Sequence, residues 1–279
     1  MNATPSAPDD FDIELQLFIE AVYQKFHYDF RHYARPSLRR RLRAAMVRFE
    51  CPTLSRLQEK LLHEPAVFVP LLDFLTVQVS ELFRDAEYFL ALRTQVVPHL
   101  RTYPSLKIWV AGCSAGEEVY SMAILLHEEG LLDRTLIYAT DINPQVLQQA
   151  ESGIYDLERI AGFTENHRRA GGKCSLSDYY SAAYGRAVFD PQLRRRMVFS
   201  DHSLATDHVF GEMQLVSCRN VLIYFARQLQ DRAVGLFHDS LCRKGFLGLG
   251  NRESLRFTAL ADAFSEVSRE ARIYQKVSP

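Results

Sequence analysis

WVAGCSAGEEVYS, residues 109–121, joins the end of an apolar run to the start of an amphipathic segment through a glycine-containing loop. We expect a strand, a tight loop and a helix in that order. The loop allows two interpretations. Gly112-Cys113-Ser114-Ala115-Gly116 fits the G-x-S-x-G turn that presents a nucleophilic serine in α/β-hydrolases. It also fits a loop that brings the backbone close to a nucleoside cofactor.

Short apolar runs alternate with amphipathic segments from Leu106 onward, and this alternation is typical of a parallel sheet covered by helices. The predicted strands are Leu106–Val110, Thr135–Ala139, Met213–Ser217, Phe246–Gly250 and Ile273–Val277. Helices are predicted over about 117–129, 144–151 and 229–241. Gly171–Phe199 contains aromatic residues bounded by turn residues, and we predict a small β insertion there.

The chain before the sheet has a different pattern. From about Phe11 to Asp73 the apolar residues recur at helical spacing, which predicts a small helical bundle. We therefore predict a helical domain over residues 1–75, a linker over 76–89 and an α/β domain over 90–279. The β subdomain is expected near 171–199, inside the α/β domain.

The composition limits the classes of function. Hydrophobic residues make up 47% of the 279 residues and the formal net charge is −1, so the chain as a whole attracts neither nucleic acid nor an anionic membrane. The five cysteines are far apart, which argues against a zinc site and a disulfide framework, and we predict no metal. The N-terminus lacks the features of a secretion signal, and no apolar run approaches the ~20 residues of a membrane span. We expect a cytoplasmic protein with no membrane insertion.

The two interpretations of the loop make different demands on the rest of the chain. A serine nucleophile needs a histidine base in a loop after a late strand. The later histidines are His127, His167, His202, His208 and His238, and none lies in such a loop. A cofactor loop needs an acidic residue at the end of the next strand to accept hydrogen bonds from the ribose, and Asp141 stands there. We favour the cofactor and keep a serine hydrolase that uses Ser114 as the alternative.

Four ordered motifs resemble those of one enzyme family. TVQVSELFRD, residues 76–85, is similar to T-T-N-x-T-x-F-F-R-D, and AGCSAGEEVYS, residues 111–121, is similar to A-x-C-S-T-G-E-E-P-Y-S. ATDI, residues 139–142, and CRNVLIYF, residues 218–225, are similar to A-T-D-I and C-R-N-V-x-I-Y-F. The chain thus resembles, over most of its length, the CheR-type chemotaxis protein-glutamate O-methyltransferases.

This resemblance implies a fold, a reaction and a cofactor. The fold is a Rossmann-like class I methyltransferase sheet with helices on both faces, a small β insertion and an N-terminal all-α domain. The reaction transfers the methyl group of S-adenosylmethionine to glutamate carboxylates of chemoreceptors. Its products are glutamate methyl esters and S-adenosylhomocysteine, and it serves adaptation in bacterial chemosensory signalling. A scaffold that has lost catalysis is a second alternative, which the presence of Arg84, Asp141 and Tyr224 disfavours.

The resemblance also implies site residues. Arg84 and Tyr224 are the expected catalytic residues and orient the acceptor carboxylate. The expected cofactor-binding residues are Gln78, Ser80, Arg84, Gly112, Glu118, Asp141, Ser203, Leu204, Arg219 and Asn220. Within this set, Glu118 is expected near the cofactor ammonium and Asp141 on its ribose.

Some positions differ from the family pattern. They are Gln78 and Ser203 in place of asparagine, Ser80 and Ala115 in place of threonine, and Val119 in place of proline. Gln78 and Ser80 keep a hydrogen-bonding group, so cofactor binding is expected to survive. Asn251-Arg252-Glu253-Ser254 differs from the usual H-S-E, and we assign no role to that turn.

A row of basic residues predicts the substrate surface. Seven arginines and no acidic residue lie between Arg31 and Arg48. On a helix that begins near Ser37, the inward stripe is expected to be Leu38, Leu42, Ala45, Met46 and Phe49. The outward residues are then Arg39, Arg40 and Arg43, which we expect to dock the acidic, glutamate-bearing helical bundle of a chemoreceptor cytoplasmic domain.

Nucleic acid is the rival for the basic row and is not expected, because aromatic residues for base stacking are sparse there. In the family, a β insertion can also hold a receptor C-terminal peptide, and Gly171–Phe199 occupies that place. We expect a monomer.

Overall fold

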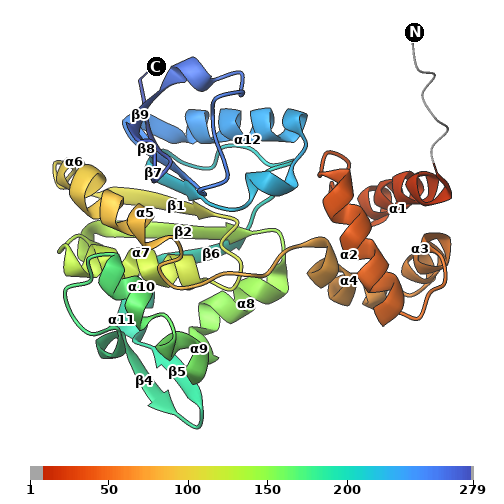
Figure 1. The fold of residues 1–279 in the computed structure, drawn as a ribbon, viewed down its shortest axis with the longest axis horizontal. Coiled ribbons are helices and arrows are strands. Elements are labelled where there is room, and N and C mark those ends of the chain that lie inside the picture. The colour runs from red at the N-terminus through yellow and green to blue at the C-terminus, as the bar shows by residue number, and fades with distance from the viewer. Residues whose placement is uncertain (1–8, 278–279) are drawn as a thin grey trace. The chain divides into compact units, whose positions relative to one another are not determined.

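The computed structural model describes residues 9–277, so residues 1–8 of the predicted helical domain lie outside the described part. The chain forms two compact units, both visible in Figure 1. One unit contains the chain up to Val77 together with Tyr224–Leu229. The other contains Gln78–Ile223 and the chain from Gln230 onward.

The first unit is helical, as predicted. Its elements are α1 (Asp10–Phe26), α2 (Arg35–Arg48), α3 (Leu54–His63), a 3₁₀ turn (Pro65–Val67) and α4 (Phe68–Leu75). Asp9 and Thr53 cap α1 and α3 by accepting backbone hydrogen bonds, while Pro36 lies in the first turn of α2. The core residues that these helices bury include Leu15, Phe18, Leu38, Leu42, Leu57 and Leu71.

The segment Tyr224–Leu229 joins this helical unit, which the sequence pattern did not predict. The Tyr224 carbonyl accepts a hydrogen bond from the Ala34 N–H at 2.8 Å, and the Ala226 N–H donates to the His32 carbonyl at 2.8 Å. The rings of Tyr33 and Phe225 meet edge to face with centroids 4.9 Å apart. Tyr224 is therefore held by the helical unit, although the residue before it belongs to the other.

The second unit is built on a seven-stranded sheet in the order β6-β2-β1-β7-β8-β10-β9. The strands are β1 (Leu106–Ala111), β2 (Thr135–Asp141), β6 (Met197–Asp201), β7 (Met213–Cys218), β8 (Leu241–Leu249), β9 (Phe264–Ser268) and β10 (Ile273–Lys276). The first five in spatial order are parallel, and β10 and β9 are antiparallel to their neighbours. The predicted fold class is confirmed, and β6 and β9 are additional strands.

Helices connect these strands (Figure 1). The chain enters the unit through α5 (Ala86–Ala91), a π-helix (Leu92–Val96) and α6 (Val97–Leu100). The predicted crossover helices are present as α7 (Glu117–Glu128), α8 (Pro144–Ser152) and α12 (Arg227–Ser240). Shorter helices are α9 (Leu157–Ala161), α10 (Thr164–Arg169) and α11 (Pro191–Arg194). Within residues 9–277, no helix is long and apolar enough to cross a membrane.

The β insertion is present, with different bounds from those predicted. Its sheet has the order β3-β5-β4, with β3 (Ile154–Asp156), β4 (Tyr180–Ala183) and β5 (Arg186–Phe189), all antiparallel. The predicted span of 171–199 was wrong at both ends. It omitted β3, and its last residues belong to β6, where Met197 and Val198 pair with β2 of the main sheet.

A buried ionic cluster ties the insertion to α7. The Glu128 side chain is 1% exposed, forms an ion pair with Arg93, and lies with Oε1 3.1 Å from His167 Nε2. Its Oε1 also accepts a hydrogen bond from the Tyr179 hydroxyl at 3.0 Å. Burial alone would raise the pKa of Glu128, but the hydrogen bonds from His167 and Lys173 and the charge of Arg93 outweigh burial and lower the pKa from 4.5 to about 2.

Glu128→Gln is expected to lower the free energy of unfolding at pH 7 by about 3 kcal/mol, because it removes the buried carboxylate that pairs with Arg93 and hydrogen-bonds with His167 and Tyr179. A carboxylate whose pKa is depressed by folding stabilises above its unfolded pKa and loses that effect as the pH falls. The difference between the two proteins should therefore shrink between about pH 5 and pH 2. Urea unfolding across this range measures it. A constant difference at all pH values would contradict the ionic explanation.

Candidate functional site

The topology of the sheet marks the site. From β1 the chain moves outward through β2 to β6 on one side, whereas β7 and β8 lie on the other. The loops at the carboxyl ends of β1 and β7 therefore diverge, and such a crevice is where open α/β sheets bind ligands. The loop that follows β1 is Gly112–Gly116, and the turn that follows β7 begins with Arg219 and Asn220.

The loop after β1 is closely held. The backbone N–H groups of Gly112 and Cys113 both donate to the Thr140 carbonyl, at 2.8 and 2.9 Å. Gly116 has φ 93 and precedes α7, a conformation that favours glycine. Ser114 is buried and its Oγ has no hydrogen-bond partner within the described residues. A serine nucleophile needs a base within hydrogen-bond reach, so this geometry does not support the hydrolase alternative.

Asp141 couples this loop to the end of β2. Its Oδ2 accepts a hydrogen bond from the Ser114 N–H at 2.9 Å, and its Oδ1 accepts one from the Asn143 N–H at 3.0 Å. Burial raises the pKa of Asp141, and the backbone hydrogen bonds from Asn143 and Ser114 oppose that shift. Each carboxylate oxygen has a second lone pair, which leaves acceptors for a ribose diol.

Glu118 and Arg219 form the second half of the site. The Glu118 carboxylate accepts hydrogen bonds from the Ser217 hydroxyl at 2.6 Å and from Arg219 Nη1 at 3.0 Å. The other Arg219 nitrogen, Nη2, donates to Asp85 Oδ2 at 2.8 Å and to the Arg84 carbonyl at 2.7 Å. The Arg219 side chain is 1% exposed, so it acts chiefly as a buried tie between the β7 turn and the segment before α5.

The remaining expected cofactor residues lie on two segments of the same unit. The exposed Gln78 and the half-buried Ser80 precede α5, and the Ser80 carbonyl accepts a hydrogen bond from Arg159. Ser203 follows β6, where its N–H donates to Asp207 Oδ2 at 2.9 Å. Leu204 beside it is buried.

The structure joins three residues of the expected set, Arg84, Glu118 and Arg219, and links Asp141 to the loop after β1. Direct hydrogen bonds join Ser114 to Asp141, Glu118 to Arg219, and Arg219 to Arg84. The buried Ser114 Oγ without a partner and the carboxylate of Asp141 are the groups that a nucleoside with a ribose diol would satisfy, so these residues fit the implied cofactor. Tyr224 belongs to the helical unit, and its guanidinium neighbour there is Arg41, with Cζ 5.4 Å from the ring.

Sequence reasoning missed several polar residues of the site. Asp85 pairs with Arg219, Ser217 donates to Glu118, and the Tyr88 hydroxyl lies 2.8 Å from Ser217 Oγ. Glu253 is also buried and accepts backbone hydrogen bonds from the β7 turn. The available signals were that Asp85 ends the TVQVSELFRD motif, that Ser217 ends a predicted strand, and that Glu253 matches the glutamate of H-S-E.

The basic row on α2 is arranged differently from the prediction. Arg39 forms ion pairs with Asp9 at 2.8 Å and with Asp12, so its charge is already neutralised within the helical unit. Arg40 and Arg43 are exposed, and neither forms an ion pair with a described residue. The guanidinium of Arg43 lies 5.0 Å from the Phe11 ring centroid.

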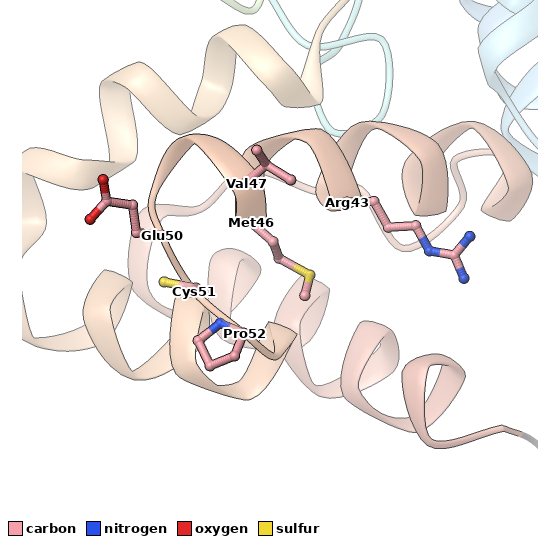
Figure 2. Close-up of a pocket in the computed structure, with 6 residues that line it drawn as sticks. All are labelled: Arg43, Met46, Val47, Glu50, Cys51 and Pro52. Carbon is pink, nitrogen blue, oxygen red and sulfur yellow. The ribbon is translucent and has the colours of Figure 1, made fainter.

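An open pocket lies at the end of α2 and in the turn that follows (Figure 2). Its lining residues are Arg43, Met46, Val47, Glu50, Cys51 and Pro52. Figure 2 shows that the Arg43 side chain extends away from the other lining side chains. The lining thus combines apolar groups with one pair of opposite charges, and we assign no ligand to it.

Comparison with known proteins finds similar chains. Residues 13–76 match the profile described as CheR methyltransferase, all-alpha domain, and residues 78–273 match the one described as CheR methyltransferase, SAM binding domain. A Pseudomonas putida protein that carries the name methyltransferase Cher3 is 58% identical over 265 residues, which cover 95% of this chain and 97% of that protein. The chemotaxis protein methyltransferase 1 of Vibrio cholerae is 30% identical over 250 residues, 86% of this chain and 88% of that protein. The chemotaxis protein methyltransferase of Listeria innocua is 29% identical, over 88% of this chain and 92% of that protein.

Proposed function

Because the chain belongs to the CheR methyltransferase family and has its S-adenosylmethionine-binding domain, we propose that it methylates glutamate side chains of chemoreceptors in the cytoplasm. The products are glutamate methyl esters and S-adenosylhomocysteine. The names of the relatives in Vibrio and Listeria support a role in chemotaxis. The partner is a receptor cytoplasmic helical bundle that carries the acceptor glutamates.

The observation that supports this proposal is the hydrogen bond between Asp141 and the loop after β1. Asp141 holds the Ser114 N–H at 2.9 Å, and so the acidic residue at the end of β2 is joined directly to the glycine-containing loop. Asp141 would hold the cofactor ribose there, and Glu118 would face its ammonium group. Ser203 and Leu204 would line the remaining wall with Asn220.

The reaction demands little acid or base chemistry from this chain. S-Adenosylmethionine, when bound, supplies an electrophilic methyl group on a sulfonium. A glutamate side chain has an ordinary pKa near ~4.3 and is already an ionised nucleophile at neutral pH, so no general base is needed. The chain therefore contributes orientation of the acceptor and exclusion of water.

Arg84 and Tyr224 are the residues that we propose for orienting the acceptor. Arg84 donates one hydrogen bond, from Nη1 to the Val79 carbonyl at 3.2 Å, and forms no ion pair with a described residue. Its charge is thus available for a carboxylate. The Tyr224 hydroxyl would donate a hydrogen bond to the same group.

Arg40 and Arg43 are the residues that we propose for docking the receptor bundle, since Arg39 is paired internally. Arg40→Ala is expected to raise the KM for an acidic helical substrate about threefold to tenfold at low salt, with kcat unchanged, and the effect should fade as salt screens the charge. Arg56→Ala is the matched control, because it removes one positive charge from α3 that is already paired with Glu59. Equal KM changes in both variants would contradict docking by α2.

The function itself is tested with methyl-labelled cofactor and purified receptor cytoplasmic fragments. We expect label on the receptor that alkali releases, as for a carboxyl methyl ester. Calorimetric titration with S-adenosylhomocysteine should show saturable binding in the same preparation. Binding without transfer to any acidic helical substrate would favour the scaffold alternative, and absence of both would overturn the proposal.

A further inference from the structure

A buried carboxylate lies beneath the turn that follows β7. Glu253 is 4% exposed and follows Gly250 by three residues, just after β8. Its Oε2 accepts hydrogen bonds from the backbone N–H groups of Asn220 at 2.9 Å and Gly250 at 2.6 Å. Its Oε1 accepts one from the Ile223 N–H at 3.2 Å. One side chain therefore holds both ends of the turn Asn220–Ile223 and joins it to the end of β8.

The surrounding backbone is fitted closely to this carboxylate. A Cβ on Gly250 would lie 2.7 Å from the Asn220 nitrogen and 2.8 Å from Glu253 Oε2, so only glycine allows this approach. Asn220 has φ 60, in the left-handed region. Such a backbone conformation is unfavourable for most residues and persists where neighbouring groups hold it.

Burying the Glu253 carboxylate disfavours the folded state. Burial raises the pKa of its carboxyl group, and the hydrogen bonds from Gly250 and Asn220 only partly oppose that effect. A buried charge without a counter-ion destabilises a fold unless its hydrogen bonds compensate. The carboxylate nevertheless has a geometry that a neutral side chain lacks, since both of its oxygens accept.

We propose that Glu253 is a positioning residue for the methyl-transfer site. Its two oxygens act on different parts of the turn. Oε2 fixes Asn220, an expected cofactor-binding residue, whereas Oε1 fixes Ile223, the residue directly before Tyr224. This role rests on the proposed function, because Asn220 and Tyr224 are assigned there. Glu253 acts through the backbone that it holds.

Glu253→Gln is the primary test. Glutamine keeps the size of the side chain but replaces one acceptor oxygen with an NH₂ group, which must face backbone N–H donors. We expect the Kd for S-adenosylhomocysteine to rise or kcat to fall, each by about tenfold according to which oxygen is lost. Hydrogen exchange of the amides in residues 219–224 should become faster in the free protein.

Glu128→Gln is the matched control, because it also removes a buried carboxylate of this unit but at the far end of α7. Both variants are compared at temperatures where they have equal free energies of unfolding. Gly250→Ala is a second variant, which keeps Glu253 and displaces Asn220 by contact; we expect it to weaken binding of S-adenosylhomocysteine in the same way.

The outcomes are distinct. Unchanged affinity, turnover and amide exchange in folded Glu253→Gln would overturn the positioning role alone. The same losses in Glu128→Gln would also overturn it, since they would then follow from lowered stability. If the unsubstituted chain failed to bind S-adenosylhomocysteine, the proposed function would fall together with the role that rests on it.

Discussion

Asp141→Ala is expected to lower the affinity for S-adenosylhomocysteine by about 100-fold, which corresponds to about 3 kcal/mol of binding free energy. The substitution removes the acceptor expected for the ribose. It also releases the Ser114 N–H, which Asp141 holds at 2.9 Å, and thereby frees the loop that approaches the cofactor. Calorimetric titration of both proteins measures the effect.

The folded state should survive this change. Burial raises the pKa of Asp141, so on raising the pH the unfolded chain loses its proton first, and stability falls as the pH passes from the ordinary value of 3.8 up through the raised pKa. At neutral pH the ionised carboxylate is therefore not a source of stability. Asp141→Asn is the control: it keeps one acceptor oxygen and should bind about tenfold more tightly than the alanine variant. Equal affinity in all three proteins would remove Asp141 from the cofactor site.

The parts of the fold that sequence predicted have strong local patterns. β1, β2 and β7 are short buried apolar runs, and α7 follows a loop whose glycines mark its start. β9 was missed because its sequence, FSEVS, is largely polar, as suits a strand at the edge of a sheet. No local sequence pattern indicates that Tyr224–Leu229 belongs to the helical unit. Its place there depends on backbone hydrogen bonds to His32 and Ala34.

In the site, too, the residues with a local sequence pattern were predicted and those placed only by the fold were missed. Asp141 was predictable because it ends a recognisable strand at a fixed distance from the loop. Asp85 and Glu253 lie in or beside family motifs, but no sequence pattern indicates their partners, and only the fold brings them to Arg219 and Asn220. For Arg39, the predicted direction of the side chain was right, but its charge is not free for a partner. Its outward direction on α2 is as expected, but α1 places Asp9 and Asp12 against it.

Arg84→Ala is expected to lower kcat by about 100-fold, because in the proposed site it removes the positive charge that orients the acceptor carboxylate. The Arg84 side chain has a single hydrogen bond to the Val79 carbonyl, and so the free energy of unfolding should change by less than about 0.5 kcal/mol. Initial rates of methyl transfer, together with thermal unfolding, separate these two effects.

Two further substitutions show whether charge or geometry matters at this position. Arg84→Lys keeps the charge but loses the planar fork, so a recovery of less than about tenfold would indicate bidentate binding of the carboxylate. Tyr224→Phe removes only a hydroxyl; the ring and its contact with Arg41 remain, so the helical unit should stay folded. If the phenol holds the same carboxylate as Arg84, the losses in the double variant should be smaller than the product of the single losses. Methyl transfer at the unsubstituted rate in both single variants would exclude both residues from orienting the acceptor.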